Sequence, residues 1–208
     1  AVQALTDVCI RRHGPSSFEQ ALAVLYRVLF LLFAESRGLV PMDHPLYRGA
    51  YTLTPLCGAS LTGVPTGAWD ALAAITALSR QGCRVDDLIV HPFNGHLFAR
   101  AAAPAAEDAS RPGPPTPRSR RRDEAMAVTL RAVGTQSTAS GRHLVSYAEL
   151  GLEELGAIYE RVIELEPGRP MARKDSGTYY TPQPLADRLV AETLAPLVEG
   201  RSTEALQI

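Results

Sequence analysis

The sequence predicts a mainly α-helical protein: an irregular helical domain with a disordered central linker. Apolar residues recur at steps of three and four in several stretches, which is typical of amphipathic helices. Hydrophobic residues make up 46% of the 208 residues, which is enough for a packed core. The formal net charge of -1 excludes a strongly basic, nucleic-acid-binding coat over the whole chain, although local basic patches remain.

The longest helix is expected over residues 17–37. Ser16 and Glu19 have the spacing of a capping box immediately before the apolar residues begin. Apolar side chains then cover most of the helix circumference, so this helix should lie at the centre of its domain. Its last turn, which holds Glu35 and Arg37, is interpreted as an ordinary polar helix end.

Several segments carry turn or loop signals instead of a helical period. Proline and glycine punctuate residues 41–67, which predicts an irregular connection with one short strand at 51–53. A helix is expected over residues 68–80. Residues 86–99 then predict a structured loop, and the small, polar residues 134–141 predict another.

Residues 101–122 differ in composition from the rest of the chain. They combine prolines, alanines and the basic run RSRRR at 118–122, without a large apolar side chain. Such a segment buries too little surface to offset the entropy lost on ordering, which predicts a mobile linker. We therefore divide the chain into an N-terminal helical region at 1–100, a Pro/Arg-rich flexible linker at 101–125, a helical connector at 126–166 and a final segment at 167–208.

Two further helix starts follow the linker. Ser146 and Glu149 repeat the capping-box spacing ahead of an apolar stripe. Thr181 then precedes Pro182, which is the preferred order of an N-cap residue and the first residue of a helix. The helix that starts there carries its apolar residues before Pro196.

Cysteine and histidine usage argues against common metal and disulfide architectures. The three cysteines lie far apart without a Cys-x-x-Cys pair, and the five histidines show no regular spacing. The longest apolar run, residues 28–34, is much shorter than a membrane span. We expect a protein of the reducing cytoplasm that has no metal site and no membrane partner.

The segment at 173–182 (RKDSGTYYTP) carries the strongest ligand-binding signal. Gly177 permits unusual backbone geometry, and the helix that starts at Thr181 points its free N–H groups and positive dipole end at whatever lies before it. Tyr179 and Tyr180 add aromatic surface with polar tips. The segment predicts a site for a ligand with an apolar body and a carboxylate. A plain helix start beside packed tyrosines is the alternative.

A longer stretch around this segment, residues 174–190 (KDSGTYYTPQPLADRLV), resembles motif X, the first cofactor-binding motif of large adenine-N6 DNA methyltransferases of the fused restriction–modification and phage-exclusion type. We call it the cofactor block. Upstream stretches resemble segments of the same enzymes: the helix block LYRVLFLLFAESRGLVP at 25–41, the loop block FNGHLF at 93–98 and the connector block YAELGLEELGAIYE at 147–160. The blocks occur in the family's order, with His96 replacing a glycine of the family's loop.

The resemblance implies part of an enzyme that uses S-adenosyl-L-methionine to methylate adenine in double-stranded DNA. Thr181 would approach the carboxylate of the cofactor, while Gly177 keeps the turn open. Tyr179, Tyr180 and Pro182 would line the wall beside its methionine and adenosine moieties.

The family's remaining machinery does not occur in this sequence. No Asp-Pro-x-x-Gly-Ser-Gly loop follows residue 182, and the catalytic Asn-Pro-Pro-Tyr motif that holds a flipped adenine is absent. We therefore predict no catalytic residue in this chain, and expect a Rossmann-like methyltransferase domain to follow Ile208 and to pack on the helices. Alone, the chain should be inactive and bind S-adenosylmethionine very weakly or not at all.

A second hypothesis belongs to a different functional class. A non-catalytic helical interaction module of a DNA-defence complex would use the basic run at 118–122 on phosphates and an acidic helix on other defence-system subunits. A solvated linker is the plainer interpretation of that run. The hypotheses differ in what should follow Ile208: the enzyme requires the missing motifs, whereas the module predicts an early stop codon.

Overall fold

The computed structural model describes residues 1–9, 16–93, 95–107, 114–151, 154, 156–157 and 183–198. The chain divides into two compact units, Ala1–Leu150 (unit 1) and Gly151–Ile208 (unit 2), and each is described by itself. Helix dominates the described residues, which confirms the mainly helical class.

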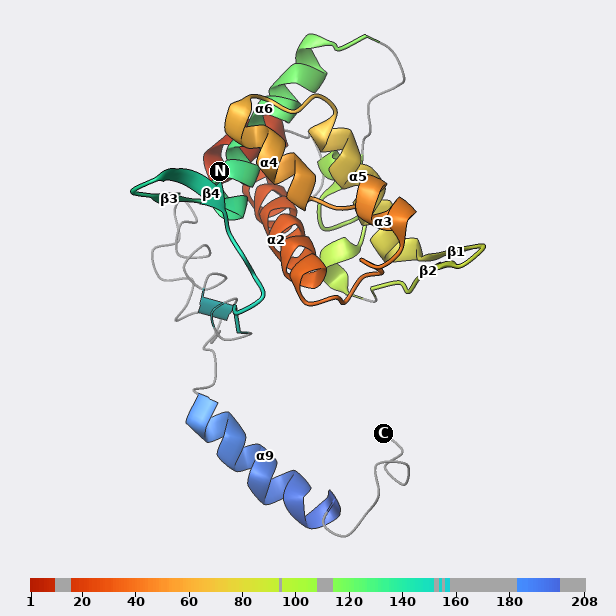
Figure 1. Ribbon diagram of the computed structural model, residues 1–208, viewed down its shortest axis with the longest axis vertical. Coiled ribbons are helices and arrows are strands. Elements are labelled where there is room, and N and C mark those ends of the chain that lie inside the picture. Colours follow the sequence, from red (N-terminus) through yellow and green to blue (C-terminus); the bar gives the residue numbers. More distant parts are fainter. Residues whose placement is uncertain are drawn as a thin grey trace. The chain divides into compact units, whose positions relative to one another are not determined.

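Unit 1 consists of helices, short connections and two small hairpins (Figure 1). Its elements are α1 (Val2–Val8), α2 (Ser17–Ser36), α3 (Pro45–Ala50), α4 (Thr54–Thr62), α5 (Ala68–Gln81), β1 (Cys83–Val85), β2 (Leu88–Val90), the 3-10 turns η1 (His96–Phe98) and η2 (Pro104–Glu107), α6 (Pro117–Gly134), β3 (Thr135–Thr138) and β4 (Gly141–Leu144). Unit 2 contributes α9 (Gln183–Val198). Strand β1 pairs antiparallel with β2, and β3 pairs antiparallel with β4.

Helix α2 forms the centre of unit 1 (Figure 1). Its start is the predicted capping box: the Ser16 hydroxyl accepts from the Glu19 N–H at 3.1 Å, and the Glu19 carboxylate accepts from the Ser16 N–H at 2.7 Å. Buried residues occur on every side of α2, which packs against α1 and α6. Among the described residues, α2 is the one helix long and apolar enough to cross a membrane. Core helices share that property, and 61% of the tested stretch is buried inside the fold.

Helices α5 and α6 complete the frame around α2. Helix α5 matches the helix predicted at 68–80, and it buries Trp69, Leu72 and Ile75. Gly82 ends it in the left-handed region at φ +66, where an added Cβ would meet the Val90 carbonyl oxygen at 2.6 Å. Helix α6 contacts α1, α2, α4 and α5, so it connects most of the helical layer.

The connection at 41–67 is more regular than predicted. It contains α3 and α4, and no strand forms at 51–53. Each helix has proline in its first turn, where the missing N–H is not needed and the fixed φ favours helix. Pro45 and Pro55 therefore mark helix starts and not the turns that the sequence predicts.

The flexible linker predicted at 101–125 is wrong for the residues that the structure describes. Helix α6 starts inside it with its own capping box, because the Thr116 hydroxyl accepts from the Ser119 N–H at 3.1 Å. Ala103, Ala105 and Ala106 are buried around η2. Small side chains bury completely where backbones approach closely, so the lack of large apolar residues does not prevent packing. Residues 108–113 lie outside the described residues.

The loop predicted at 134–141 is also replaced by regular structure. Helix α6 passes directly into the β3–β4 hairpin, in which Thr135 lies opposite Leu144 and Thr138 opposite Gly141. The β-branched threonines favour extended backbone, a preference that the surrounding small residues conceal in the sequence.

The helix predicted to start at Ser146 does not begin there. Residues 145–150 are non-helical, and Ala148 donates its N–H to the Ser146 hydroxyl at 3.4 Å within a turn. The buried Tyr147 anchors this segment, because its hydroxyl donates to the Val133 carbonyl at 2.6 Å. Of the stretch that follows, only residues 151, 154, 156 and 157 are described up to 182, and the last three are helical.

The last predicted helix is present as α9. It continues through Pro196, although the sequence predicts that its apolar stripe ends before this residue. Its large apolar side chains are exposed: Leu185, Leu189, Val190, Leu194 and Val198. Thr181 and Pro182, the predicted cap, lie outside the described residues.

The contact between α6 and α4 can be tested at Gly134. A Cβ at this position would collide with the Cys57 Sγ atom. Intrinsic helix propensity alone would make Gly134→Ala stabilising, by about 1 kcal/mol. We expect the opposite sign, a loss of about 2 kcal/mol from overpacking, in urea unfolding.

The double variant Gly134→Ala/Cys57→Ala removes the Sγ atom, the closer of the two Cys57 atoms that the new methyl group meets, and leaves the Cβ atom at 2.9 Å. It should be less destabilised than the sum of the two single variants predicts. A Gly134→Ala protein that is more stable than the wild type would contradict this packing.

Candidate functional site

The residues predicted to bind the cofactor cannot be placed. Gly177, Tyr179, Tyr180, Thr181 and Pro182 all lie outside the described residues, whose next segment is α9. Their roles therefore stay predictions. The polar chemistry that the structure does describe lies in unit 1, in a buried ion network and an arginine-lined cleft.

The buried ion network joins α2, α5 and η2. The Arg27 guanidinium, fully buried in α2, contacts one Glu107 carboxylate oxygen at 3.1 Å, and Arg80 of α5 contacts the other at 2.7 Å. Burial lowers the pKa of Arg27, and the Glu107 carboxylate opposes that shift. An arginine is still cationic after such a shift, so Glu107 holds together two cations that would otherwise repel.

The same arginines hold the loop block in place. Arg27 donates through Nε to the Leu97 carbonyl at 2.8 Å and through Nη2 to the Ala99 carbonyl at 2.8 Å. Arg80 donates to the Phe98 carbonyl at 3.3 Å. Together with Glu107, the carbonyls of Leu97 and Ala99 therefore give each nitrogen of the buried Arg27 guanidinium a partner.

Aromatic rings cover the apolar side of this attachment. Phe30 of α2 meets Phe93 and Phe98 edge to face, with ring centroids 5.3 and 5.6 Å apart. The Phe93 N–H also donates to the Ser79 carbonyl at 2.7 Å. The described residues of the loop block, 93 and 95–98, thus pack against the helix block and have a structural role there.

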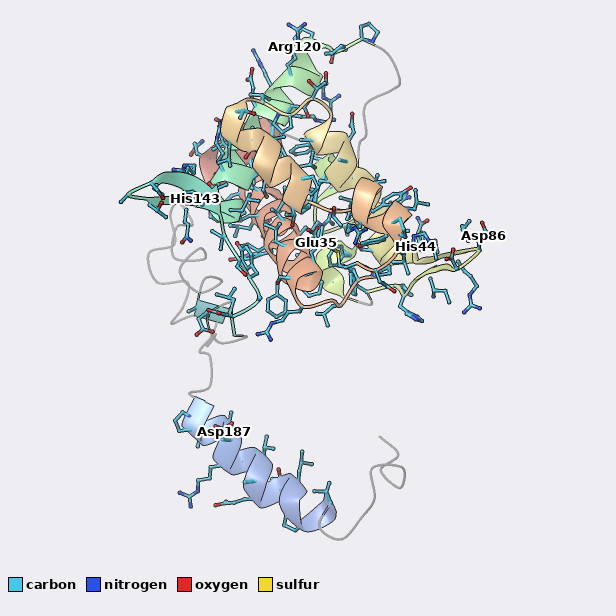
Figure 2. All side chains as sticks on the ribbon, in the orientation of Figure 1. Glu35, His44, Asp86, Arg120, His143 and Asp187 are labelled. Carbon is cyan, nitrogen blue, oxygen red and sulfur yellow. The ribbon has the colours of Figure 1, made fainter. Side chains whose placement is uncertain are left out.

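Glu35 is not the ordinary polar helix end that the sequence analysis predicts. It is 7% exposed and lies inside unit 1 (Figure 2), where its carboxylate accepts from the N–H groups of Leu53 at 2.5 Å and Thr54 at 3.1 Å. It also accepts from the Thr54 hydroxyl at 2.7 Å. Glu35 therefore caps α4, whose own N-cap residue is a leucine without a capping side chain. Burial raises the pKa of Glu35, and these hydrogen bonds partly offset the rise.

Asp123 performs the same task for α5. Its carboxylate accepts from the Gly67 N–H at 2.8 Å and the Trp69 N–H at 3.1 Å, at a helix start where glycine offers no cap. The neighbouring Arg122 lies over the Trp69 ring at 5.2 Å and donates to the Ala105 carbonyl at 3.3 Å. Both side chains come from the segment predicted to be a linker.

Three of the sequence blocks meet on α2. Arg27 of the helix block binds the loop block, as above. Arg37, at the C-terminal end of the same helix, donates to the Leu150 carbonyl of the connector block at 2.8 Å. The helix block therefore positions both of the others by charged side chains that bind backbone carbonyls.

The buried thiol and phenol groups of unit 1 are poor nucleophiles because burial keeps them protonated. Burial raises the pKa of the Cys9 thiol to about 11 and of the Cys57 thiol to about 12, so both are protonated at neutral pH. Burial likewise raises the pKa of Tyr47 and of Tyr147 to about 12. Within the described residues, no group of His, Cys, Asp and Glu side chains could hold a metal ion.

An open cleft of about 480 Å³ lies between α1 and the start of α6. Its lining is formed by Asp7 and Val8 of α1 and by Pro117, Arg118, Arg121 and Arg122 of α6. These arginines belong to the basic run at 118–122, for which the sequence leaves open a phosphate contact or a solvated linker. The structure places it on an ordered helix.

Sequence reasoning missed the interior charges, but a signal was present. Arg27 occurs in a helix that is apolar on nearly every side, so its head has no route to water except through the core. Such a residue must find several acceptors, which predicts a backbone segment folded against it. The identity of its partners cannot be deduced in this way, because Glu107 is distant in the sequence.

The network predicts a large effect of neutralising Glu107. Glu107→Gln leaves the buried Arg27 without its counter-ion, and we expect the free energy of unfolding to fall by about 3 kcal/mol. Urea unfolding followed by circular dichroism measures this. The control is Glu124→Gln on the exposed side of α6, which should change little. Equal midpoints for the two variants would contradict the network.

The raised pKa of Glu35 predicts how the free energy of unfolding depends on pH. Its folded-state pKa lies above the ordinary value of 4.5, so folding favours its protonated form. The stability that Glu35 contributes is then fully present below its unfolded-state pKa and is lost as the pH rises through the folded-state pKa. The wild type minus Glu35→Gln difference in unfolding free energy should therefore shrink from acid towards neutral pH. A difference that grows with pH would show that the carboxylate is stabilised in its ionised form.

Whole-chain similarity gives no further guide to the function. No protein-family model, no curated protein and no solved structure matches this chain. The functional interpretation therefore depends on the blocks and on the contacts that join them.

Proposed function

We propose that this chain supplies the helical N-terminal region and motif X of an S-adenosylmethionine-dependent, adenine-N6-specific DNA methyltransferase of a restriction–modification or phage-defence system. The observation that carries the proposal is the ordered set of sequence blocks. The contacts between blocks support it, because residues that carry the resemblance also join the blocks physically.

The helix block illustrates this support. The apolar periodicity of this block does not account for its three charged residues. Each of them makes a hydrogen bond to another segment of unit 1. Arg27 holds the loop block, Glu35 caps α4 and Arg37 holds the connector block. The residue types of the block are thus those that a scaffold of this shape requires.

The exposed stripe of α9 gives a second, independent argument. Within unit 2, Leu185, Leu189 and Leu194 are each about half exposed, on a helix that directly follows the predicted cofactor turn. An isolated helix of this length is marginal in water, and exposed apolar stripes mark interaction surfaces. In the proposed enzyme, this stripe packs on the Rossmann-like methyltransferase domain.

In this proposal the cofactor segment closes one side of the S-adenosylmethionine pocket. Thr181 and the free N–H groups at the start of its helix favour the cofactor carboxylate. Tyr179, Tyr180 and Pro182 cover its methionine and adenosine moieties, and Gly177 gives the turn its freedom. The catalytic motif that transfers the methyl group belongs to the domain that follows, as do the contacts that read the DNA sequence.

The second candidate function is a non-catalytic helical module that acts with DNA and with other defence-system subunits in the cytoplasm. The arginine-lined cleft favours it, because this feature needs no cofactor and no further domain to bind an anion. The two candidates share DNA as a partner and differ in the cofactor.

The test uses the longer protein that contains this chain. Thr181→Ala should weaken S-adenosylmethionine binding by about 1 kcal/mol, roughly five-fold in Kd, because the cap and the hydroxyl contact are lost. Isothermal titration calorimetry measures this. The matched control is Thr193→Ala in α9, whose hydroxyl donates within its own helix to the Leu189 carbonyl.

Equal cofactor affinities of the two threonine variants would remove Thr181 from the pocket. The reading frame provides a second check, since Asp-Pro-x-x-Gly-Ser-Gly and then Asn-Pro-Pro-Tyr must follow Ile208. A stop codon without either motif would contradict the enzyme and favour the module.

A further inference from the structure

The cleft between α1 and α6 combines features that point to a ligand. Arg118 and Arg121 are exposed at its edge, whereas Arg122 is only 4% exposed. The ring of Trp69 and the Ala105 carbonyl hold the Arg122 guanidinium in position. One of the three cations is therefore fixed in advance, which reduces the entropy lost when an anion binds.

Charge in and around the cleft is strongly biased. Of the described residues that line it, Asp7 is the acidic one, and part of its carboxylate already accepts from the Gln3 amide at 2.9 Å. The nearby Asp123 is engaged in capping α5. The first turn of α6 has no acidic residue, so its arginines add to the positive end of the helix dipole. Arginines at this end destabilise the helix when no ligand is bound, and a bound anion would remove that repulsion.

The residue types indicate phosphate groups on a long chain. The guanidinium fork matches phosphate oxygens in a bidentate manner, and neighbouring arginines on one helix face can engage successive groups. The cleft is partly open to solvent, so the phosphate groups of a polymer that lies across its mouth can reach the arginines. Val8 and Pro117 are its apolar lining among the described residues, and no aromatic ring there could stack on a base.

We infer that the arginine-lined cleft between α1 and α6 binds the phosphate backbone of DNA without reading its sequence. The choice of DNA over other polyanions rests on the proposed function, whereas the preference for phosphate rests on the cleft itself. Phosphate contacts position a protein on the duplex and carry no sequence information. The cleft is a positioning surface, separate from the predicted cofactor segment.

The experiment measures fluorescence anisotropy of a labelled duplex with the full chain over a range of salt concentrations. For the wild type, log Kd should rise linearly with log salt between about 50 and 200 mM, and unrelated duplex sequences should bind equally. The Arg118→Gln/Arg121→Gln variant should bind at least ten-fold more weakly. Its slope should be smaller by about 1.8, which corresponds to two lost phosphate contacts.

Two charge-matched controls separate the cleft from general electrostatics. Arg84→Gln neutralises an exposed arginine of the β1–β2 hairpin, and Arg120→Gln neutralises an exposed arginine at the free end of α6 that does not line the cleft (Figure 2). Each should change the affinity less than Arg121→Gln does. Circular dichroism should show the same helix content for all variants, because the substituted side chains are exposed. The thermal midpoint should not fall in the α6 variants, because each removes a positive charge from the positive end of the helix dipole.

Several outcomes would overturn the inference. An unchanged salt slope in the double variant, or an equal loss in Arg120→Gln and Arg121→Gln, would show that the cleft makes no specific phosphate contact. Binding of inorganic phosphate in isothermal titration calorimetry, without any binding of the duplex, would identify a small-anion site. Binding to phosphatidylserine vesicles but not to the duplex would identify a membrane surface. None of these results involves S-adenosylmethionine, so the proposed function can stand or fail separately.

Discussion

The constraint on which unit 1 depends is the burial of a guanidinium in its central helix. Arg27 has no exposed surface, and a cation taken out of water costs several kcal/mol unless it is paired and hydrogen-bonded. Glu107 and the carbonyls of Leu97 and Ala99 satisfy it together. The hydrogen bonds of the Arg27 side chain therefore fix the backbone between η1 and η2 against α2. Arg80 of α5 binds the same Glu107 carboxylate and so attaches this segment to α5 as well.

Capping between helices makes the remaining elements interdependent. Helix α4 receives its cap from Glu35 of α2, and α5 receives its cap from Asp123 of α6. Helices as short as α4 do not persist alone in water, so each needs both the apolar contact and the donated carboxylate. Disturbing α2 or α6 therefore exposes unsatisfied N–H groups in a different helix. Unit 1 should unfold as one cooperative body for this reason.

Hydrophobic periodicity and capping patterns correctly predicted the helices that depend on residues close together in the sequence. The start of α2 at Ser16, the length of α5 and the presence of α9 all follow from short sequence patterns. The rules failed where distant residues decide. The helix in the Pro/Arg-rich segment depends on its contacts with α1, α4 and α5, which composition does not reveal. Of the candidate sites, the basic run was found from sequence but misplaced on a linker, while the buried partners of Arg27 could not be found.

Arginine has two different roles in unit 1: one inside the fold and one at the surface. Arg27 and Arg80 share the single Glu107 carboxylate and bind backbone carbonyls, so both side chains are held inside the fold. Arg118 and Arg121 stand at the exposed start of α6, where the helix dipole adds to their positive charge. Arg122 lies between these extremes, because it packs on Trp69 yet lines the cleft. In the proposed role, a frame that holds its interior arginines in place and presents the outer ones from helix α6 offers a preformed cationic surface to the DNA backbone, as a scaffold that positions a substrate for chemistry performed elsewhere requires.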